Sequence, residues 1–164
     1  MYEIVNKLIQ LNKSISTMES CTGGYIANAI TNVPGASDIF MFGAVTYSNE
    51  YNVKMGVSSS LIDKYSVYSM EVANDMSKTI SNYTNSDYGI GVTGKLNRVD
   101  KNNNSGENNV VFISIYDRIN NKFYTDIVTV LYDERCKNKE MVLESIKKIL
   151  EEILWKYIIR WAKL

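Results

Sequence analysis

The chain contains no histidine, which removes the commonest general base and a common metal ligand from any site that it builds. A Ser-His-Asp triad is therefore excluded, and proton transfer is left to serine, tyrosine, lysine, cysteine, aspartate or glutamate. Cysteine is scarce as well: Cys21 and Cys136 lie far apart in the sequence and show no metal-type spacing. We expect both to be free thiols in a reducing compartment.

An excess of one charge is also missing, because 18 basic residues balance 18 acidic ones and no long block of either occurs. This balance gives no electrostatic reason to expect nucleic acid or an anionic membrane as a partner. Neither a signal peptide nor an apolar run of about 18 residues is present, so we expect a cytoplasmic protein. The length of 164 residues, with 45% hydrophobic residues, suits one domain that buries a core.

Hydrophobic periodicity predicts interleaved helices and strands along the chain. Apolar residues at helical spacing predict helices over residues 1–11, 25–30, 70–83 and 139–159. Runs of strand-forming residues predict strands over residues 14–19, 40–47, 87–93, 110–116 and 122–131. Residues 94–109 lack apolar material, and we expect this loop to be mobile or ordered only by a ligand. The alternation indicates a layered α/β domain.

Hydroxyl and carboxylate side chains gather with turn-forming residues in residues 17–50. Within this stretch, Ser-Cys-Thr-Gly-Gly at residues 20–24 separates an expected strand from an expected helix. Its glycines allow a close backbone approach to a ligand, and the Ser20 and Thr22 hydroxyls can hold an oxyanion or a phosphate together with helix N-terminal amides. A helix N-cap with glycines for tight packing is the plainer interpretation. Cys21 is interpreted as a small buried residue.

Ser37 and Tyr47 belong to two further polar clusters, Gly-Ala-Ser at residues 35–37 and Tyr-Ser-Asn-Glu at residues 47–50. A serine attacks a carbonyl only when a base removes its proton. Where histidine is missing, that base is usually a desolvated lysine, sometimes relayed through tyrosine. Ser37 and Tyr47 supply the serine and the tyrosine of such an arrangement. Their alternative roles are structural, a helix N-cap for Ser37 and a phenol at the edge of the core for Tyr47.

Six motifs, in order along the chain, resemble those of the CinA C-terminal domain family. They are ESCTGG at residues 19–24, TNVPGAS at 31–37, VTYSNE at 45–50, MGV at 55–57, SMEVA at 69–73 and GVTG at 91–94. The resemblance extends over residues 4–154 and implies a three-layer α/β/α sandwich with a mixed central sheet, formed as a single domain by residues 1–164. It also implies a nicotinamide mononucleotide amidohydrolase, which releases ammonia and leaves nicotinate mononucleotide without a metal or an organic cofactor.

Carried over by position, the resemblance implies which residues form the site of this hydrolase. Ser37 would attack the carboxamide carbon, Tyr47 would be its hydrogen-bonding helper, and backbone amides of the surrounding turns would stabilise the oxyanion. Arg135 would bind the phosphate of the nucleotide with two hydrogen bonds. The other pocket residues implied are Ser20, Thr22, Gly23 and Thr93. The implied partner is a small nucleotide like nicotinamide mononucleotide.

The sequence departs from the family pattern at the base. The family lysine that follows Tyr-Ser-Asn-Glu by two residues is replaced by Asn52, whose amide does not titrate near neutral pH. Lys54 is the nearest lysine, although two residues of helix rotate a side chain by about 200°. Lys95, close to Thr93, is the second candidate. Two functions stay open: an amidohydrolase with a rearranged base, or a member that binds a nucleotide or a protein partner without turnover.

Residues 155–164 are apolar, aromatic and basic. They could form a surface for homo-oligomerisation, or they could end a helix that returns to the core. We favour the second arrangement.

Overall fold

A five-stranded sheet with the strand order β2-β1-β3-β4-β5 forms the centre of the molecule. The computed structural model describes the backbone of residues 1–161 and the side chains of residues 1–156. β1, β2 and β3 are parallel, whereas β4 is antiparallel to both β3 and β5. The strands are β1 (Ile15–Glu19), β2 (Gly43–Val45), β3 (Tyr88–Gly94), β4 (Val110–Asp117) and β5 (Lys122–Thr129).

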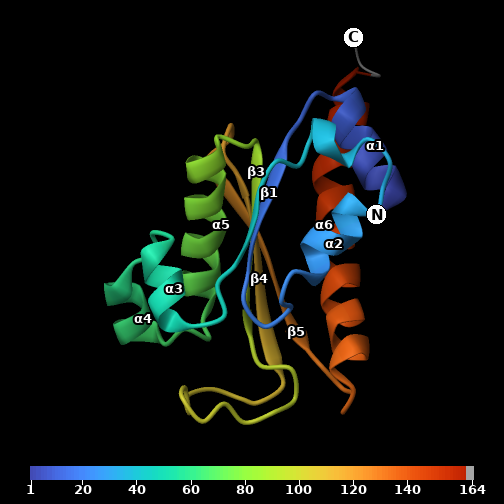
Figure 1. The fold of residues 1–164 in the computed structure, drawn as a ribbon. Helices are drawn as coiled ribbons and strands as arrows, with labels where there is room; N and C mark the ends of the chain where they lie inside the picture. Colours follow the sequence, from blue (N-terminus) through green and yellow to red (C-terminus); the bar gives the residue numbers. More distant parts are fainter. Residues whose placement is uncertain (162–164) are drawn as a thin grey trace.

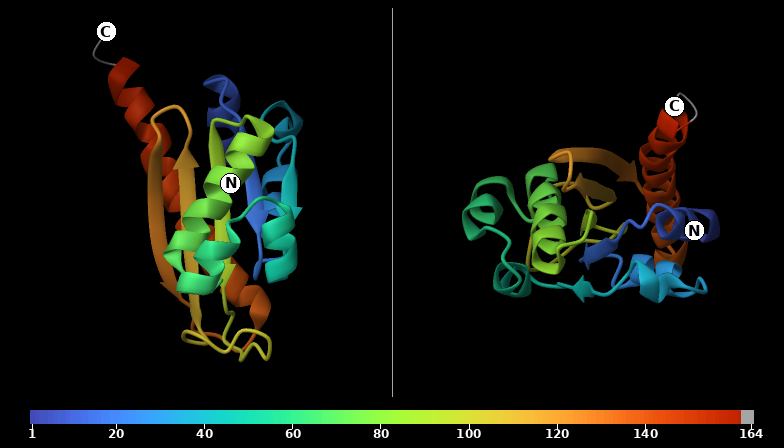
Figure 2. Two further views of the ribbon diagram at one scale, coloured as in Figure 1. Left: turned by 90° about the vertical axis from the view of Figure 1, so that its left-hand side faces the viewer. Right: turned by 90° about the horizontal axis from the view of Figure 1, so that it is seen from above.

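Helices cover both faces of the sheet, which confirms the predicted three-layer α/β/α sandwich (Figure 1; Figure 2, right). One face carries α1 (Tyr2–Gln10), α2 (Tyr25–Thr31) and α6 (Arg135–Trp161). The other face carries α5 (Met70–Thr84), with the short helices α3 (Asn49–Lys54) and α4 (Ser59–Tyr65) on the same side. The short 3-10 helix η1 (Ala36–Asp38) precedes β2.

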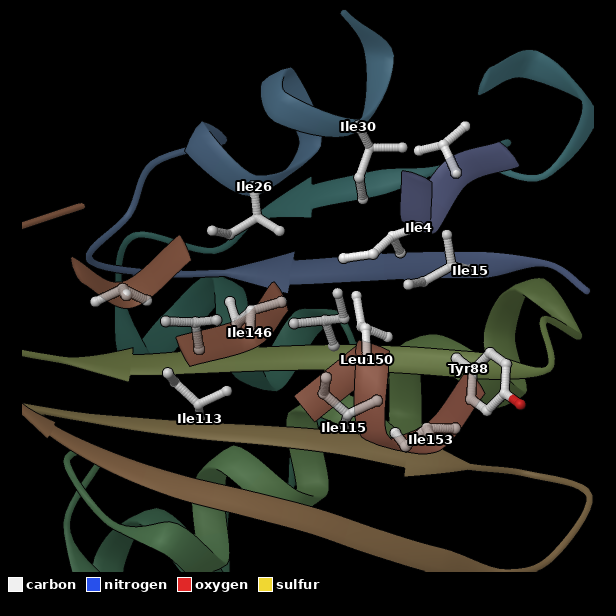
Figure 3. Packing of buried hydrophobic residues seen from close by; sticks show 14 of the residues in the cluster. Ile4, Ile15, Ile26, Ile30, Tyr88, Ile113, Ile115, Ile146, Leu150 and Ile153 are labelled. Atoms are coloured by element: carbon white, nitrogen blue, oxygen red, sulfur yellow. The ribbon is translucent and has the colours of Figure 1, made fainter. Parts of the chain in front are cut away.

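The larger part of the core lies between the sheet and helices α1, α2 and α6 (Figure 3). Ile113 and Ile115 of β4 belong to the same buried cluster as Ile146 and Leu150 of α6. The α6 residues recur at helical spacing, so one apolar stripe of the helix faces the sheet. Burying a side chain of this size stabilises the fold by about 1.5–3 kcal/mol. This stripe therefore fixes α6 on the sheet.

On the opposite face, α5 approaches β3 so closely that only glycine fits at two positions of the strand, Gly89 and Gly91. A Cβ atom on Gly91 would lie 2.4 Å from the carbonyl oxygen of Ala73, and one on Gly89 would lie 2.0 Å from that of Ser77. The hydroxyl groups of Ser77 and Ser114, from α5 and β4, are hydrogen-bonded at 2.9 Å. We call the close backbone approach of Gly89 and Gly91 in β3 to Ala73 and Ser77 in α5 the α5–β3 seam.

The strongest sequence patterns are confirmed, with small changes at their ends. The helices expected over residues 1–11, 70–83 and 139–159 are α1, α5 and α6. The strand expected over residues 40–47 is shorter than predicted, because β2 lies at the edge of the sheet and pairs with β1 through three residues. The two long hairpin strands β4 and β5 match their predictions closely.

The end of α6 bears on the two alternatives for residues 155–164. The side chain of Trp155 is 61% exposed, so at this position the helix does not return to the core. The backbone of α6 continues to Trp161, whereas residues 162–164 lie outside the described part of the chain.

Candidate functional site

A cavity of about 510 Å³, which we call the strand-end cavity, opens where the parallel strands β1, β2 and β3 end. The chain leaves β1 through α2 on one face of the sheet and returns to β3 through α5 on the other face. Such a change of direction leaves a crevice beyond the carboxyl ends of the strands, where ligands bind in open α/β sheets. The side chains that line this cavity include those of Ser20, Tyr47, Tyr68, Lys95, Arg98 and Arg135.

The turn after β1 is held by the carboxylate of Glu19, which is 1% exposed. Its Oε2 accepts hydrogen bonds from Thr22 Oγ1 at 2.7 Å and from the backbone N–H groups of Gly24 and Ile26, both at 3.1 Å. Its Oε1 accepts one from the N–H of Ala27 at 2.8 Å. The backbone donors belong to the start of α2, where N–H groups have no partner within the helix. A negative charge is also favoured at that end of a helix. Glu19 therefore caps α2 and fixes the turn that borders the cavity.

Arg135 connects the start of α6 to the turn after β1 and to the segment after β2. Its Nη2 donates to Tyr47 Oη at 2.9 Å and to the carbonyl oxygen of Cys21 at 3.4 Å. The side chain of Tyr47 is 63% exposed, so it stands at the rim of the cavity instead of at the edge of the core. The structure thus brings three of the predicted site residues, Ser20, Tyr47 and Arg135, to one cavity.

Cys21 borders the cavity but belongs to the buried apolar cluster, as predicted. Burial raises the pKa of its thiol to about 12, and the positive charge of Arg135 offsets this only in part. The thiol is therefore protonated at neutral pH, and a protonated thiol is a poor nucleophile.

Hydrogen bonds within the protein hold the loop of residues 95–109 over the cavity. Tyr68 Oη donates a short hydrogen bond to Asp100 Oδ2. Nδ2 of Asn49, the first residue of α3, donates to Asn103 Oδ1 at 2.9 Å. The polar sequence of the loop predicts a mobile segment or one ordered by a ligand, and these contacts give the loop partners within the protein.

The pair of Tyr68 and Asp100 has a defined protonation state. Burial, together with the hydrogen bond to Asp100, raises the pKa of Tyr68, and the same hydrogen bond lowers the pKa of Asp100. At neutral pH the phenol is thus the donor and the carboxylate the acceptor. The ring of Tyr68 lies 5.0 Å from Lys95 Nζ, a distance that suits a cation–π contact.

Positive charge dominates the wall of the cavity. Lys95, Arg98 and Arg135 line it, and the two carboxylates on its wall, Asp100 and Glu50, are both bonded to other side chains of the protein. An anionic ligand group in this cavity would therefore meet cations without displacing a carboxylate. Arginine in particular binds phosphate oxygens with two parallel hydrogen bonds.

Ser37 does not share this site. It is exposed in η1, and the chain passes through η1 before it enters β2. The backbone N–H of Ile15, the first residue of β1, donates to the carbonyl oxygen of Ile39 at 2.8 Å, so η1 lies beside the amino ends of the parallel strands. The five residues of β1 at about 3.3 Å each place Ser37 about 16 Å away from the other end. The structure therefore does not bring Ser37 to Tyr47, which follows β2 at its carboxyl end.

Thr22, Gly23 and Thr93 lie in the segments beside the cavity and do not line it. Thr22 is bonded to Glu19, as described above. Thr93 is fully buried, and its Oγ1 donates to the carbonyl oxygen of Val67 at 2.8 Å, which joins the end of β3 to the segment before α5. Gly23 adopts a φ of 62° in the turn after β1, a left-handed conformation that favours glycine.

The position of the missing family lysine is part of the packing. Asn52 is 1% exposed, and its Oδ1 accepts a hydrogen bond from Thr46 Oγ1 at 2.7 Å. Lys54 points outward from α3 and forms an ion pair with Glu50 at 2.5 Å, as the helical rotation of two residues predicts. Of the two lysines that were candidates to replace the base, Lys95 lines the cavity and Lys54 does not.

A wider hollow of about 610 Å³ lies between β5 and α6. Its polar groups bond to one another, as in the 2.6 Å hydrogen bond from Ser145 Oγ to Asp126 Oδ2. We place the candidate site in the smaller strand-end cavity, because two serines, two tyrosines, two arginines and a lysine line it.

Arg98, which lines the cavity, and two residues that hold the site together were not recognised from the sequence. Glu19 is one, although a carboxylate shortly before a helix is a known N-terminal signal and could have identified it. Tyr68 is the other, and its partner Asp100 is 32 residues away in the chain. No local sequence pattern reports such a contact.

Within the described residues, no group of three or more histidine, cysteine, aspartate or glutamate side chains is arranged to hold a metal ion. Over the same part of the chain, no helix has the length and apolar character needed to cross a membrane.

Comparison with known sequences identifies relatives. The CinA C-terminal domain profile matches residues 1–153. A competence-damage inducible protein of Alkaliphilus oremlandii is 47% identical over 94 residues, which are 56% of this chain and 23% of that protein. One from Clostridium botulinum is 41% identical over 92 residues, which are 56% of this chain and 22% of that protein. The match thus spans less than a quarter of the length of these relatives.

Solved structures share the fold. A CinA superfamily protein from Klebsiella pneumoniae has a TM-score of 0.85 at 20% sequence identity, over 94% of this chain and 95% of that one. A competence/damage inducible protein from Agrobacterium tumefaciens has a TM-score of 0.76 at 24% identity, over 93% of each chain. At these identities the likeness concerns the fold alone. The profile match over residues 1–153 goes further, and the chain belongs to the CinA C-terminal domain family.

Proposed function

We propose that the strand-end cavity binds a nucleotide like nicotinamide mononucleotide and that the domain hydrolyses its carboxamide. The observation that carries this proposal is that Ser20 shares one cavity with Lys95, Arg98 and Arg135. The hydroxyl is the group that an amide hydrolase needs, and the guanidinium groups of Arg98 and Arg135 suit the phosphate of a mononucleotide. The choice of nicotinamide comes from the family motifs in the sequence.

Ser20 is the attacking group in this proposal, in place of Ser37. Ser20 lines the cavity, whereas Ser37 is exposed at the other end of the sheet. Ser20 Oγ attacks the carboxamide carbon, ammonia leaves, and water hydrolyses the acyl-enzyme to nicotinate mononucleotide. The rings of Tyr47 and Tyr68 border the same cavity and suit a positively charged pyridine ring.

Ammonia release from nicotinamide mononucleotide tests the proposal, with nicotinate mononucleotide identified by mass spectrometry. The wild-type protein should release ammonia, Ser20→Ala should reduce the rate to background, and the matched control Ser37→Ala should leave it unchanged. Arg135→Ala should raise KM more than it lowers kcat, because phosphate binding acts on substrate and transition state alike. An inactive wild type, or loss of activity in Ser37→Ala alone, would exclude the proposal.

A second function is supported by Asn52. This residue stands where the family has its lysine and is bonded to Thr46, away from the cavity. The pocket would then bind the nucleotide without turnover. In that case nicotinamide mononucleotide should raise the thermal midpoint while no ammonia appears. At a ligand concentration of 100 Kd, the gain in the free energy of unfolding is about 2.7 kcal/mol. Absence of any shift would count against both functions.

A further inference from the structure

Lys95 is held at the cavity by its neighbours on several sides. It is the first residue after β3, and its backbone N–H donates to the carbonyl oxygen of Val110 in β4 at 2.9 Å. Its side chain lies over the ring of Tyr68, and its Nζ is 3.4 Å from Asn108 Oδ1. The residue is 4% exposed, which is unusual for lysine. The amine is thus positioned by the fold and does not extend into solvent.

Lys95 also has no carboxylate partner among the described residues. The ion pairs found there involve Lys13, Lys54, Lys137 and Lys147. Asp100, on the same loop as Lys95, receives its hydrogen bonds from Tyr68, Asn102 and Asn103. Where histidine is missing, a buried lysine is the usual group that removes a proton from a nucleophile.

We propose that Lys95 is the general base that activates Ser20. This inference rests on the proposed function, since it supplies the proton acceptor that Asn52 cannot provide. It places the base on the loop after β3 instead of on α3, where the family lysine would stand. Lys54 cannot take this role, because it points out of the cavity and pairs with Glu50.

The proton moves between these two side chains in both halves of the reaction. The amine of Lys95 takes the hydroxyl proton of Ser20 as Oγ bonds to the carboxamide carbon, and the carbonyl electron pair moves to oxygen. The pair then returns, the carbon–nitrogen bond breaks, and the Lys95 ammonium gives its proton to the leaving nitrogen, so that ammonia departs. Water next attacks the ester, Lys95 accepts its proton and passes it to Ser20 Oγ, and nicotinate mononucleotide is released.

A fluorophosphonate tests the base without the nucleotide. The reagent phosphonylates a serine oxygen and releases fluoride, and the labelled residue can be identified by mass spectrometry. Wild-type protein should be labelled at Ser20. Lys95→Met should slow the labelling at least about 100-fold, the lower limit for loss of a general base. Two lysines outside the cavity provide controls: Lys54→Met on α3, and Lys139→Met on α6, whose Nζ lies over the ring of Tyr25. Both should label at the wild-type rate.

A rescue experiment separates loss of the amine from loss of the fold. In a Cys136→Ser background, Lys95→Cys should be slow, and alkylation with bromoethylamine should restore the labelling because it rebuilds a side chain with an amine at that position. Cys136 is removed because it is an exposed free thiol. Cys21 lines the same cavity as residue 95, so the Cys136→Ser protein with Lys95 intact, treated with bromoethylamine in the same way, is the control for alkylation of Cys21. Near-ultraviolet circular dichroism checks that each variant is folded.

The outcomes distinguish this inference from the proposed function. Labelling of Ser20 at the wild-type rate in folded Lys95→Met, or an unlabelled Ser20 in the wild type, would overturn the role of Lys95. Ammonia release by the wild type that persists unchanged in Lys95→Met would overturn it too, while the proposed function would stand. Labelling that depends on Lys95 without any ammonia release would support the activated serine and reject nicotinamide mononucleotide as the substrate.

Discussion

Replacing the Glu19 carboxylate with an amide is the sharpest test of how the turn after β1 is built. The substitution Glu19→Gln keeps the size of the side chain and removes its charge. In the native protein all four contacts of Glu19 are donors directed at its two oxygens. A glutamine has one oxygen and an NH₂ group, so it cannot accept at both positions.

The expected loss follows from these contacts. If the glutamine oxygen takes the place of Oε2, three hydrogen bonds remain, but they no longer involve a charged acceptor. Each is then weaker by about 1 kcal/mol. The NH₂ group then faces the N–H of Ala27, and a buried donor without an acceptor costs about 1–3 kcal/mol. Relief from burying a charge offsets part of this loss. We expect a net destabilisation of about 3 kcal/mol.

Urea unfolding followed by circular dichroism measures this difference, and amide hydrogen exchange locates it. The N–H groups of Ile26 and Ala27 should exchange faster in Glu19→Gln, because they lose their acceptor or its charge. Glu50→Gln is the control, since Glu50 is an exposed glutamate in a surface ion pair, and it should change stability by less than about 0.5 kcal/mol. If Glu19→Gln behaved like this control, Glu19 would not be the residue that holds the turn.

Three other predictions concern the rest of the fold. Burial alone would raise the pKa of Asp87, but hydrogen bonds from the Lys13 amine and from the backbone N–H of Ser14 outweigh burial and lower the pKa below 3.8. Asp87→Asn should therefore cost about 1–2 kcal/mol at pH 7 and progressively less as the pH falls through the folded-state pKa; equal urea midpoint differences at pH 7 and pH 3 would disprove this. With Ellman's reagent at pH 8, Cys136 should react in the native protein and Cys21 only after unfolding, so two rapidly reacting thiols in the native state would show that Cys21 is not buried. Gly91→Ala should destabilise the protein by more than about 2 kcal/mol, because its Cβ would lie 2.4 Å from a carbonyl oxygen, and an unchanged thermal midpoint would contradict that contact.

The layers could be predicted from the sequence because they depend on local periodicity. α5 carries Val72, Met76 and Ile80 on one buried face, and β4 is a continuous run of strand-forming residues. The limits of β2 could not be predicted in this way. Residues 40–47 have strand-forming composition, but the length of an edge strand depends on how many residues its single neighbour pairs with.

The candidate site could be predicted only in part, because it is built from contacts between distant segments. The motifs place Ser20 and Tyr47 at the ends of parallel strands, and the structure brings them together. Ser37 is close to both in sequence, but α2 carries the chain back to the amino ends of the strands before Ser37, and β2 carries it forward again before Tyr47. Proximity in the sequence does not show which end of a strand a turn occupies. Which lysine enters the cavity depends on the path of residues 95–109, and that path is fixed by partners such as Tyr68 far away in the chain.

The α5–β3 seam has a consequence for how this site can change over evolutionary time. Backbone meets backbone there, so no layer of side chains can readjust to a substitution, and α5 and β3 must keep their relative position. Tyr68 comes just before α5 and Lys95 just after β3, and both inherit that fixed position. Surface segments beyond the strands carry no such constraint. A domain of this kind can therefore exchange an amine on α3 for one on the neighbouring loop and leave its framework intact.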